Sequence, residues 1–199
     1  MSNGAWKKAI SHMKNNGGYA RSRDLRAAGV HPSVLPALAS SGTVVRLKRG
    51  LYVLASAPAR DEMMEAVLSV PGSTLCLGSA LSFHKLTTWE PPQIHLAVKE
   101  GRRVEIPRFP PMQLYHFSAK TFELGLMERP QKAGILRVYD AERTVCDLFR
   151  FRRRLGADMA AAALREYMKR RSRNITKLLD YADRLRISGP VRGALEILL

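Results

Sequence analysis

Hydrophobic residues near the start of the chain first follow a helical period and later alternate. Apolar side chains recur at helical spacing through residue 14 and predict an amphipathic first helix: Ala5, Trp6, Ile10 and Met13. The turn-forming stretch Asn-Asn-Gly-Gly at 15–18 ends that helix, and Tyr19 and Ala20 follow as a brief strand. Ser22 is expected to cap a short second helix that carries Asp24 in its first turn and ends at Gly29.

Residues 30–54 predict a third helix and then a hairpin. This helix runs to Ser41. Its apolar face is expected to point inward and carries Val34, Leu35 and Leu38, and its opposite face, of small and polar residues, carries Ser33, Ala37 and Ser40. Pro36 lacks an N–H group, so this helix either starts near Val34 or is bent. Residues 43–48 alternate between apolar and polar, Arg49-Gly50 supplies a turn, and residues 51–54 return as a second strand. Together these elements predict a winged helix-turn-helix, in which the third helix enters the DNA major groove and the hairpin, or wing, reaches phosphates or the minor groove.

The remainder of the chain mixes helices with strands. A small-residue stretch at 55–59 predicts a linker, and we therefore expect two domains, residues 1–57 and 58–199. The second domain is expected to hold strands at 94–98, 103–106, 112–117 and 135–139, and helices at 61–70, 78–86, 140–154, 157–171, 174–186 and 190–199. Asp140 should cap its helix, with Glu142 and Arg143 on the exposed first turn. The predicted fold class is α+β, an N-terminal winged helix-turn-helix followed by a mixed α+β domain with a helical C-terminal end.

The basic side chains are concentrated in the first part of the chain. The 199 residues carry a formal net charge of +16, and 46% of them are hydrophobic, which is enough for a folded core. Residues 1–59 hold nine basic side chains and one acidic side chain, Asp24, a net charge of +8. A polyanion is the expected partner of this segment, with nucleic acid first and an anionic membrane second.

Eight residues of this segment are the candidates for DNA contact: Arg21, Arg23, Arg26, Ser33, Ser40, Arg46, Lys48 and Arg49. The six cations surround the second helix and the wing, where they suit phosphates. The third helix exposes no Arg, Asn or Gln, so direct reading of bases is expected to be thin. The competing interpretation is that these cations form an ordinary solvated surface.

Two further basic clusters lie at 150–154 and 169–173. They form a solvated face, contact additional phosphates, or dock an acidic patch of a partner protein. The sequence leaves these three alternatives open.

The sequence favours neither a secreted nor a membrane protein. No apolar run reaches the roughly 18 residues that a membrane span needs, and the first residues lack a secretory pattern, so a cytoplasmic location is expected. Cys76 and Cys146 have neither CxxC nor zinc-ligand spacing and are expected to be buried free thiols.

No set of residues predicts catalysis, a metal site or a cofactor. Gly78-Ser79 could open a nucleotidyltransferase site, but no Asp-x-Asp pair follows to hold metal ions. No Asp or Glu has a Lys two positions later, as a restriction-type nuclease would need. No spacing ties together the remaining candidate side chains, which are expected to be core or surface residues: His84, His95, His116, Glu142 and Asp147.

Several stretches of the chain are similar to one known family. They are Gly17-Gly18-Tyr19-Ala20 with Arg23-Asp24-Leu25, the wing Val45-Arg46-Leu47-Lys48-Arg49-Gly50-Leu51-Tyr52, Gly78-Ser79-Ala80-Leu81 with His84-Lys85-Leu86, and Asp140-Ala141-Glu142-Arg143-Thr144-Val145-Cys146-Asp147-Leu148. In these stretches the chain resembles the AbiEi-type antitoxins, regulators of abortive-infection toxin–antitoxin systems.

The resemblance implies a repressor that binds inverted repeats of double-stranded DNA in its own promoter. It also implies that the second domain helps to neutralise a toxin resembling a nucleotidyltransferase. Because the residues offer no catalytic set, we do not expect an enzyme. The alternative is a protein- or RNA-interaction module with a basic surface and little operator specificity.

Overall fold

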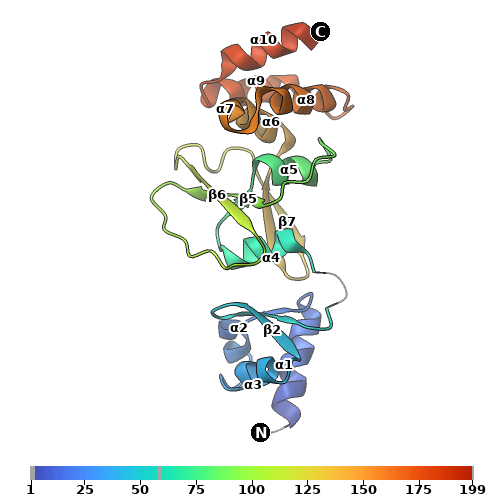
Figure 1. Ribbon diagram of the computed structural model, residues 1–199, viewed down its shortest axis with the longest axis vertical. Helices are drawn as coiled ribbons and strands as arrows, with labels where there is room; N and C mark the ends of the chain where they lie inside the picture. Colours follow the sequence, from blue (N-terminus) through green and yellow to red (C-terminus); the bar gives the residue numbers. More distant parts are fainter. Residues whose placement is uncertain (1–2, 58–59, 199) are drawn as a thin grey trace. The chain divides into compact units, whose positions relative to one another are not determined.

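The computed structural model describes residues 3–57 and 60–198 (Figure 1). By internal contacts the chain divides into two compact units. The first unit comprises Met1–Pro71 together with Glu105–Pro110 and Arg129–Leu136, and the second comprises Gly72–Val104, Pro111–Glu128 and Arg137–Leu199. Among the described helices, none is both long and apolar enough to cross a membrane.

The first unit contains a small antiparallel sheet against which short helices pack. The strands are β1 (Tyr19–Arg21), β2 (Val44–Lys48) and β3 (Leu51–Leu54), in the order β1-β3-β2. The helices are α1 (Asn3–Asn15), α2 (Ser22–Ala27), α3 (Val34–Ser40) and α4 (Glu62–Ser69). Met13, Leu25 and Leu38 lie in the apolar core that joins α1, α2 and α3 to the sheet. The predicted winged helix-turn-helix elements are confirmed.

Helix α3 begins at Val34, the first of the two alternatives that the sequence allowed. Pro36 therefore falls in the first turn, where a helix does not need the missing N–H group. The prediction that Ser22 caps α2 is wrong, because β1 runs directly into the helix and Arg21 takes the cap position without a side-chain hydrogen bond. The Ser22 N–H instead donates to the Gly50 carbonyl at 2.9 Å, which ties the start of α2 to the turn of the wing.

The second unit is built around a five-stranded sheet with the strand order β6-β5-β4-β8-β7, of which the segment Arg129–Leu136 in the last two strands of the sequence is assigned to the first unit. The strands are β4 (Thr74–Leu75), β5 (Ile94–Lys99), β6 (Met112–Phe117), β7 (Leu126–Gln131) and β8 (Gly134–Tyr139). Strand β4 pairs antiparallel with β5 and parallel with β8, and β5 pairs parallel with β6. The sheet thus contains both parallel and antiparallel pairs, and together with the helices described next it confirms the predicted α+β class.

Among the residues that the structure describes, six helices belong to the second unit, and five of them gather at its C-terminal end (Figure 1). They are α5 (Leu77–Phe83), α6 (Ala141–Arg150), α7 (Arg152–Leu155), α8 (Ala157–Met168), α9 (Ile175–Arg184) and α10 (Ser188–Leu198). Cys76 and Cys146 are free thiols within the core of this unit, as predicted, and burial raises the pKa of both.

The predicted strand at 103–106 is wrong. These residues form an irregular segment in which Val104 is half-buried and Ile106 is exposed, so their alternation has no covered face and no neighbouring strand. The sequence also did not predict β4, which has two residues, or β7, whose side chains are mostly exposed.

Replacing Leu38 with Ala should lower the free energy of unfolding of the first unit by about 2–5 kcal/mol, because its side chain is fully buried and a cavity would remain. Trp6 packs against the same core, so its fluorescence during urea unfolding, in a Trp89→Phe background, reports on this unit. The control is Ser40→Ala, at an exposed position of the same helix, with an expected change within about 0.5 kcal/mol. Equal effects of the two substitutions would contradict the assignment of α3 to this core.

Candidate nucleic-acid interface

The register of the small sheet brings two distant basic residues to the same place. Leu51, at the start of β3, is paired with Arg21 at the end of β1 and with Lys48 at the end of β2. A bulge between Arg46 and Lys48 adds one residue to the wing and shifts its pairing. The end of β1, which leads into α2, therefore lies beside the turn of the wing.

A cavity of about 310 Å³, here called the basic cavity, opens where these segments meet. Five cations line it, together with Ser22, Gly50, Leu51, Leu68 and Pro71: Arg21, Arg23, Arg26, Lys48 and Arg49. No acidic side chain is among the lining residues. Burial lowers the pKa of Arg21, and repulsion from Arg23 lowers it further, so an anion in the cavity would stabilise both charges. The cavity is suited to a phosphate group.

A second cavity of about 310 Å³, here called the groove, lies between α2, α3 and the wing. Its walls are partly apolar, with Leu25, Leu35 and Tyr52, and partly polar. Arg26 and Arg49 line both the groove and the basic cavity, and Arg46 lines the groove alone. Cations from the second helix and the wing therefore surround one continuous part of the surface.

The outer face of α3 offers little for reading bases. Ser33 and Ser40 are exposed, as is Pro36 between them, whereas Ala37 is half-buried. The Ser33 hydroxyl is 2.7 Å from Nδ1 of His31, so it is already engaged by a neighbouring side chain. The exposed polar groups on α3 itself are hydroxyls, which discriminate weakly among bases.

Four of the six predicted cations are exposed and available to a ligand. Arg23 forms an exposed ion pair with Asp24, at 3.3 Å between Nε and Oδ1, and such a pair contributes little. Arg46 donates from Nε to the Lys48 carbonyl at 3.4 Å. The side chains of Arg26 and Arg49 make neither a hydrogen bond nor an ion pair with any other residue that the structure describes.

The other two cations bind the C-terminal end of α4. Lys48 Nζ donates to the Ser69 carbonyl at 2.6 Å, and Arg21 Nη2 donates to the Leu68 carbonyl at 3.3 Å. Sequence reasoning missed this contact, because 21 and 47 positions separate the partners and no local pattern connects them.

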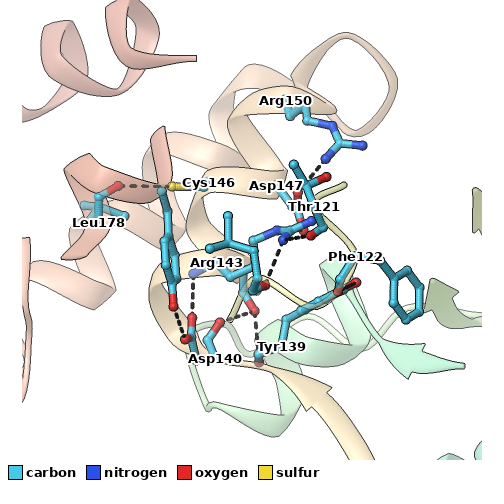
Figure 2. Close-up of polar contacts among 12 residues, drawn as sticks. Thr121, Phe122, Tyr139, Asp140, Arg143, Cys146, Asp147, Arg150 and Leu178 are labelled. Atoms are coloured by element: carbon cyan, nitrogen blue, oxygen red, sulfur yellow. Dashed lines mark hydrogen bonds and ion pairs between the residues drawn. The ribbon is translucent and has the colours of Figure 1, made fainter. Parts of the chain in front are cut away.

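The polar residues at the start of α6 form a buried network in the second unit (Figure 2). Arg143 is fully buried and donates from Nε to Asp147 Oδ2 at 2.9 Å. Its Nη1 donates to the carbonyls of Thr121 at 2.6 Å and Leu124 at 2.8 Å, and its guanidinium lies 4.5 Å from the centre of the Tyr139 ring. The prediction that Arg143 lies on an exposed turn is therefore wrong, because the helix begins inside the core of this unit.

The prediction that Glu142 is exposed is also wrong, because this residue is buried and has partners other than those of Arg143. Tyr167 donates its hydroxyl to Glu142 at 2.8 Å, and Lys177 Nζ lies 3.3 Å from Glu142 and 3.0 Å from Asp140. Burial opposes the ammonium charge, but the hydrogen bond with Asp140 and the two carboxylates raise the pKa of Lys177. Asp140 also caps α6 as predicted, accepting the Arg143 N–H at 2.7 Å. These carboxylates already have partners.

The three histidines considered for catalysis have separate environments. His84 hydrogen bonds to the Tyr139 carbonyl at 2.7 Å, and His116 is exposed on β6. Burial lowers the pKa of His95 to about 4, and its Nδ1 accepts the Gly78 N–H at 3.2 Å, so the ring is neutral at pH 7. Within residues 3–57 and 60–198, no group of three His, Cys, Asp or Glu side chains is placed to hold a metal ion.

Several cations of the two basic clusters at 150–154 and 169–173 have partners within the second unit. Arg150 Nη1 lies 3.2 Å from Asp147 Oδ1, and the Arg154 guanidinium lies 5.0 Å from the centre of the Tyr115 ring. Arg170 donates to the His84 carbonyl, and Lys169 pairs with Glu166 at 2.6 Å. Part of the charge in these clusters therefore stabilises the unit that carries it.

Comparison with known protein families gives a match in the first unit. Residues 12–55 match the family model described as "Transcriptional regulator, AbiEi antitoxin". The match spans the end of α1, β1, α2, α3 and the wing, all within the first unit. None of the curated proteins matches the chain significantly.

The fold of the chain is similar to that of a solved mycobacterial protein. The match is to the crystal structure of the RV2827C protein from Mycobacterium tuberculosis, with a TM-score of 0.55 and 14% sequence identity, over 98% of this chain and 82% of that chain. At this identity the likeness concerns the fold alone.

Replacing Asp147 with Ala should lower the free energy of unfolding by about 3–5 kcal/mol, because Arg143 would remain buried without its carboxylate. The matched control is Asp158→Ala, which removes an exposed carboxylate from the first turn of α8 and should cost less than about 0.5 kcal/mol. Urea unfolding followed by circular dichroism measures both. If the two substitutions cost the same, the Arg143–Asp147 pair does not stabilise the core as described.

Proposed function

We propose that this protein is a DNA-binding transcriptional regulator that represses its own promoter by occupying inverted repeats, and that it counteracts a nucleotidyltransferase-like toxin. The observation that carries the DNA-binding part is the basic cavity, five cations without an acid, within the stretch that matches an AbiEi antitoxin model. Regulator and antitoxin are the words of that family description, and their extension to this chain is part of the proposal.

In the proposed mode of binding, residues 1–57 act as the DNA-binding domain. Helix α3 lies in the major groove with Ser33 and Ser40 toward the bases, and the wing follows the adjacent backbone. Arg21, Arg23, Arg26, Arg46, Lys48 and Arg49 neutralise phosphates, which supplies most of the affinity and makes it dependent on salt. Because α3 has few groups that read bases, much of the specificity comes from the spacing of repeats and the shape of the duplex.

Residues 58–199 are proposed to form the antitoxin-type domain, which binds the toxin without catalysis or a cofactor. The buried ion pairs of α6 support a structural role for its charged motif rather than a chemical one. Co-expression with a nucleotidyltransferase-like protein from the neighbouring gene tests this part of the proposal. Growth that is not restored would contradict it without affecting the DNA-binding part.

Replacing Arg26, Arg46 and Arg49 together with Ala should weaken duplex binding and flatten its dependence on salt. Each phosphate contact that is lost should lower the slope of log K against log salt by about 0.9, or about 3 for the triple variant. Fluorescence anisotropy with a labelled duplex of the DNA upstream of its own reading frame, between about 50 and 200 mM salt, measures this slope.

The matched control removes the same charge elsewhere in the first unit. Lys7, Lys8 and Lys14 are exposed on α1 and line neither the basic cavity nor the groove. The variant in which all three are replaced by Ala should keep most of the slope of log K against log salt. If this slope falls equally in both triple variants, net charge rather than this surface drives binding.

The full chain should bind its upstream duplex at least about 10-fold more tightly than a duplex of the same composition with the sequence shuffled, a ratio well below the roughly 1,000-fold or more of typical specific DNA binding because α3 has few groups that read bases. Competition with unlabelled duplexes and with RNA of the same sequence measures this ratio. Equal affinity for both duplexes, or a preference for RNA, would favour the alternative function, an interaction module with a basic surface and little operator specificity.

A further inference from the structure

Helix α4 lies outside the stretch 12–55 that matches the family model, yet it contacts two of the proposed phosphate-binding cations. A helix leaves its last carbonyl groups without partners, and they carry the negative end of the helix dipole. In α4, the carbonyls of Leu68 and Ser69 accept from Arg21 and Lys48, respectively. The end of this helix therefore holds cations that belong to β1 and to the wing.

A buried carboxylate fixes α4 in this position. Glu65 is fully buried and accepts from Arg60, at 2.7 Å from Nε and 2.6 Å from Nη2. It also accepts from the Tyr19 hydroxyl at 3.0 Å. Tyr19 lies on β1, two residues before Arg21, so the same strand is bound to the middle and to the end of α4. We call Glu65, Arg60 and Tyr19 the latch.

The bonds to the carbonyls leave the two cations able to bind a ligand. Arg21 has five N–H donors and Lys48 has three, and each uses one of them at the end of α4. Both side chains line the basic cavity. A long side chain held at the cavity loses less rotational freedom on binding than a free one, so phosphate binding costs less entropy.

We propose that α4 is a positioning element of the DNA-binding surface, in which Glu65, through the latch, places the end of the helix so that its carbonyls hold Arg21 and Lys48 at the basic cavity. The proposal rests on the DNA-binding function proposed above and assigns it a residue that contacts no DNA. It extends the functional unit to Ser69, beyond the stretch that defines the family match.

The test compares latch variants of the full chain on the same labelled upstream duplex. Glu65→Ala and Glu65→Gln should raise Kd about 3- to 10-fold at about 100 mM salt and lower the salt slope by about 1–2, as one or two phosphate contacts are lost. Glu62→Gln removes an exposed carboxylate from the same helix and should change neither quantity. In an Arg21→Ala, Lys48→Ala background, Glu65→Ala should produce no further fall in slope, because the residues through which it acts are absent.

The slope separates positioning from mere support of the fold. A variant that only unfolds part of the population lowers the fraction competent to bind and leaves the slope unchanged, so a raised Kd with the wild-type slope would overturn the proposal. An unchanged Kd would overturn it as well.

If circular dichroism shows that Glu65→Ala does not fold, Tyr19→Phe and Arg60→Gln, which each remove one arm of the latch, must give the same fall in slope. Failure of the Arg26, Arg46 and Arg49 triple variant to reduce binding would instead contradict the DNA-binding function.

Discussion

The pairing of β3 with both of its neighbours is the constraint on which the proposed interface depends. Leu51 stands opposite Arg21 on one side and Lys48 on the other, which are 27 positions apart in the sequence. Adjacent strands lie about 4.8 Å apart, so the two cations start from backbone positions separated by about two strand spacings. A shift of β3 by one residue would place its four buried side chains on the opposite faces of the sheet and remove Leu51 from its position between Arg21 and Lys48. The core of the first unit and its charged surface therefore depend on the same register.

Much of the first unit could be predicted from the sequence, because its elements are short and its patterns local. The apolar spacing of Val34, Leu35 and Leu38 placed the inward face of α3 correctly, and the alternation in the wing identified the hairpin. The candidate cations could be chosen by charge alone. The pattern could not predict which of these cations have partners within the fold. Lys48 donates to a carbonyl of α4, whereas the side chain of Arg49, the next residue, has no such partner among the described residues.

The second unit was harder to predict, because its partners come from distant parts of the chain. Glu142 and Arg143 are charged and follow a capping Asp, which locally indicates an exposed first turn. Their burial depends on carbonyls from residues 121 and 124 and on side chains from α8 and α9, which the sequence near α6 does not reveal. A buried arginine needs partners for most of its N–H groups, and only the assembled fold supplies them. The charged residues at the start of α6 thus contribute to the packing of the second unit.

The reactivity of the two cysteines reports on local unfolding of the second unit. Both thiols are buried with raised pKa values, so at neutral pH almost no thiolate is available to oxidants or alkylating reagents. Cys146 also contacts the Leu178 carbonyl at 3.4 Å, which ties its exposure to the separation of α6 from α9. Because the first unit contains no cysteine, labelling of the intact chain by a thiol reagent follows the local unfolding of the second unit alone. The opening of the second unit can thus be followed in the unmodified protein without a contribution from the first unit.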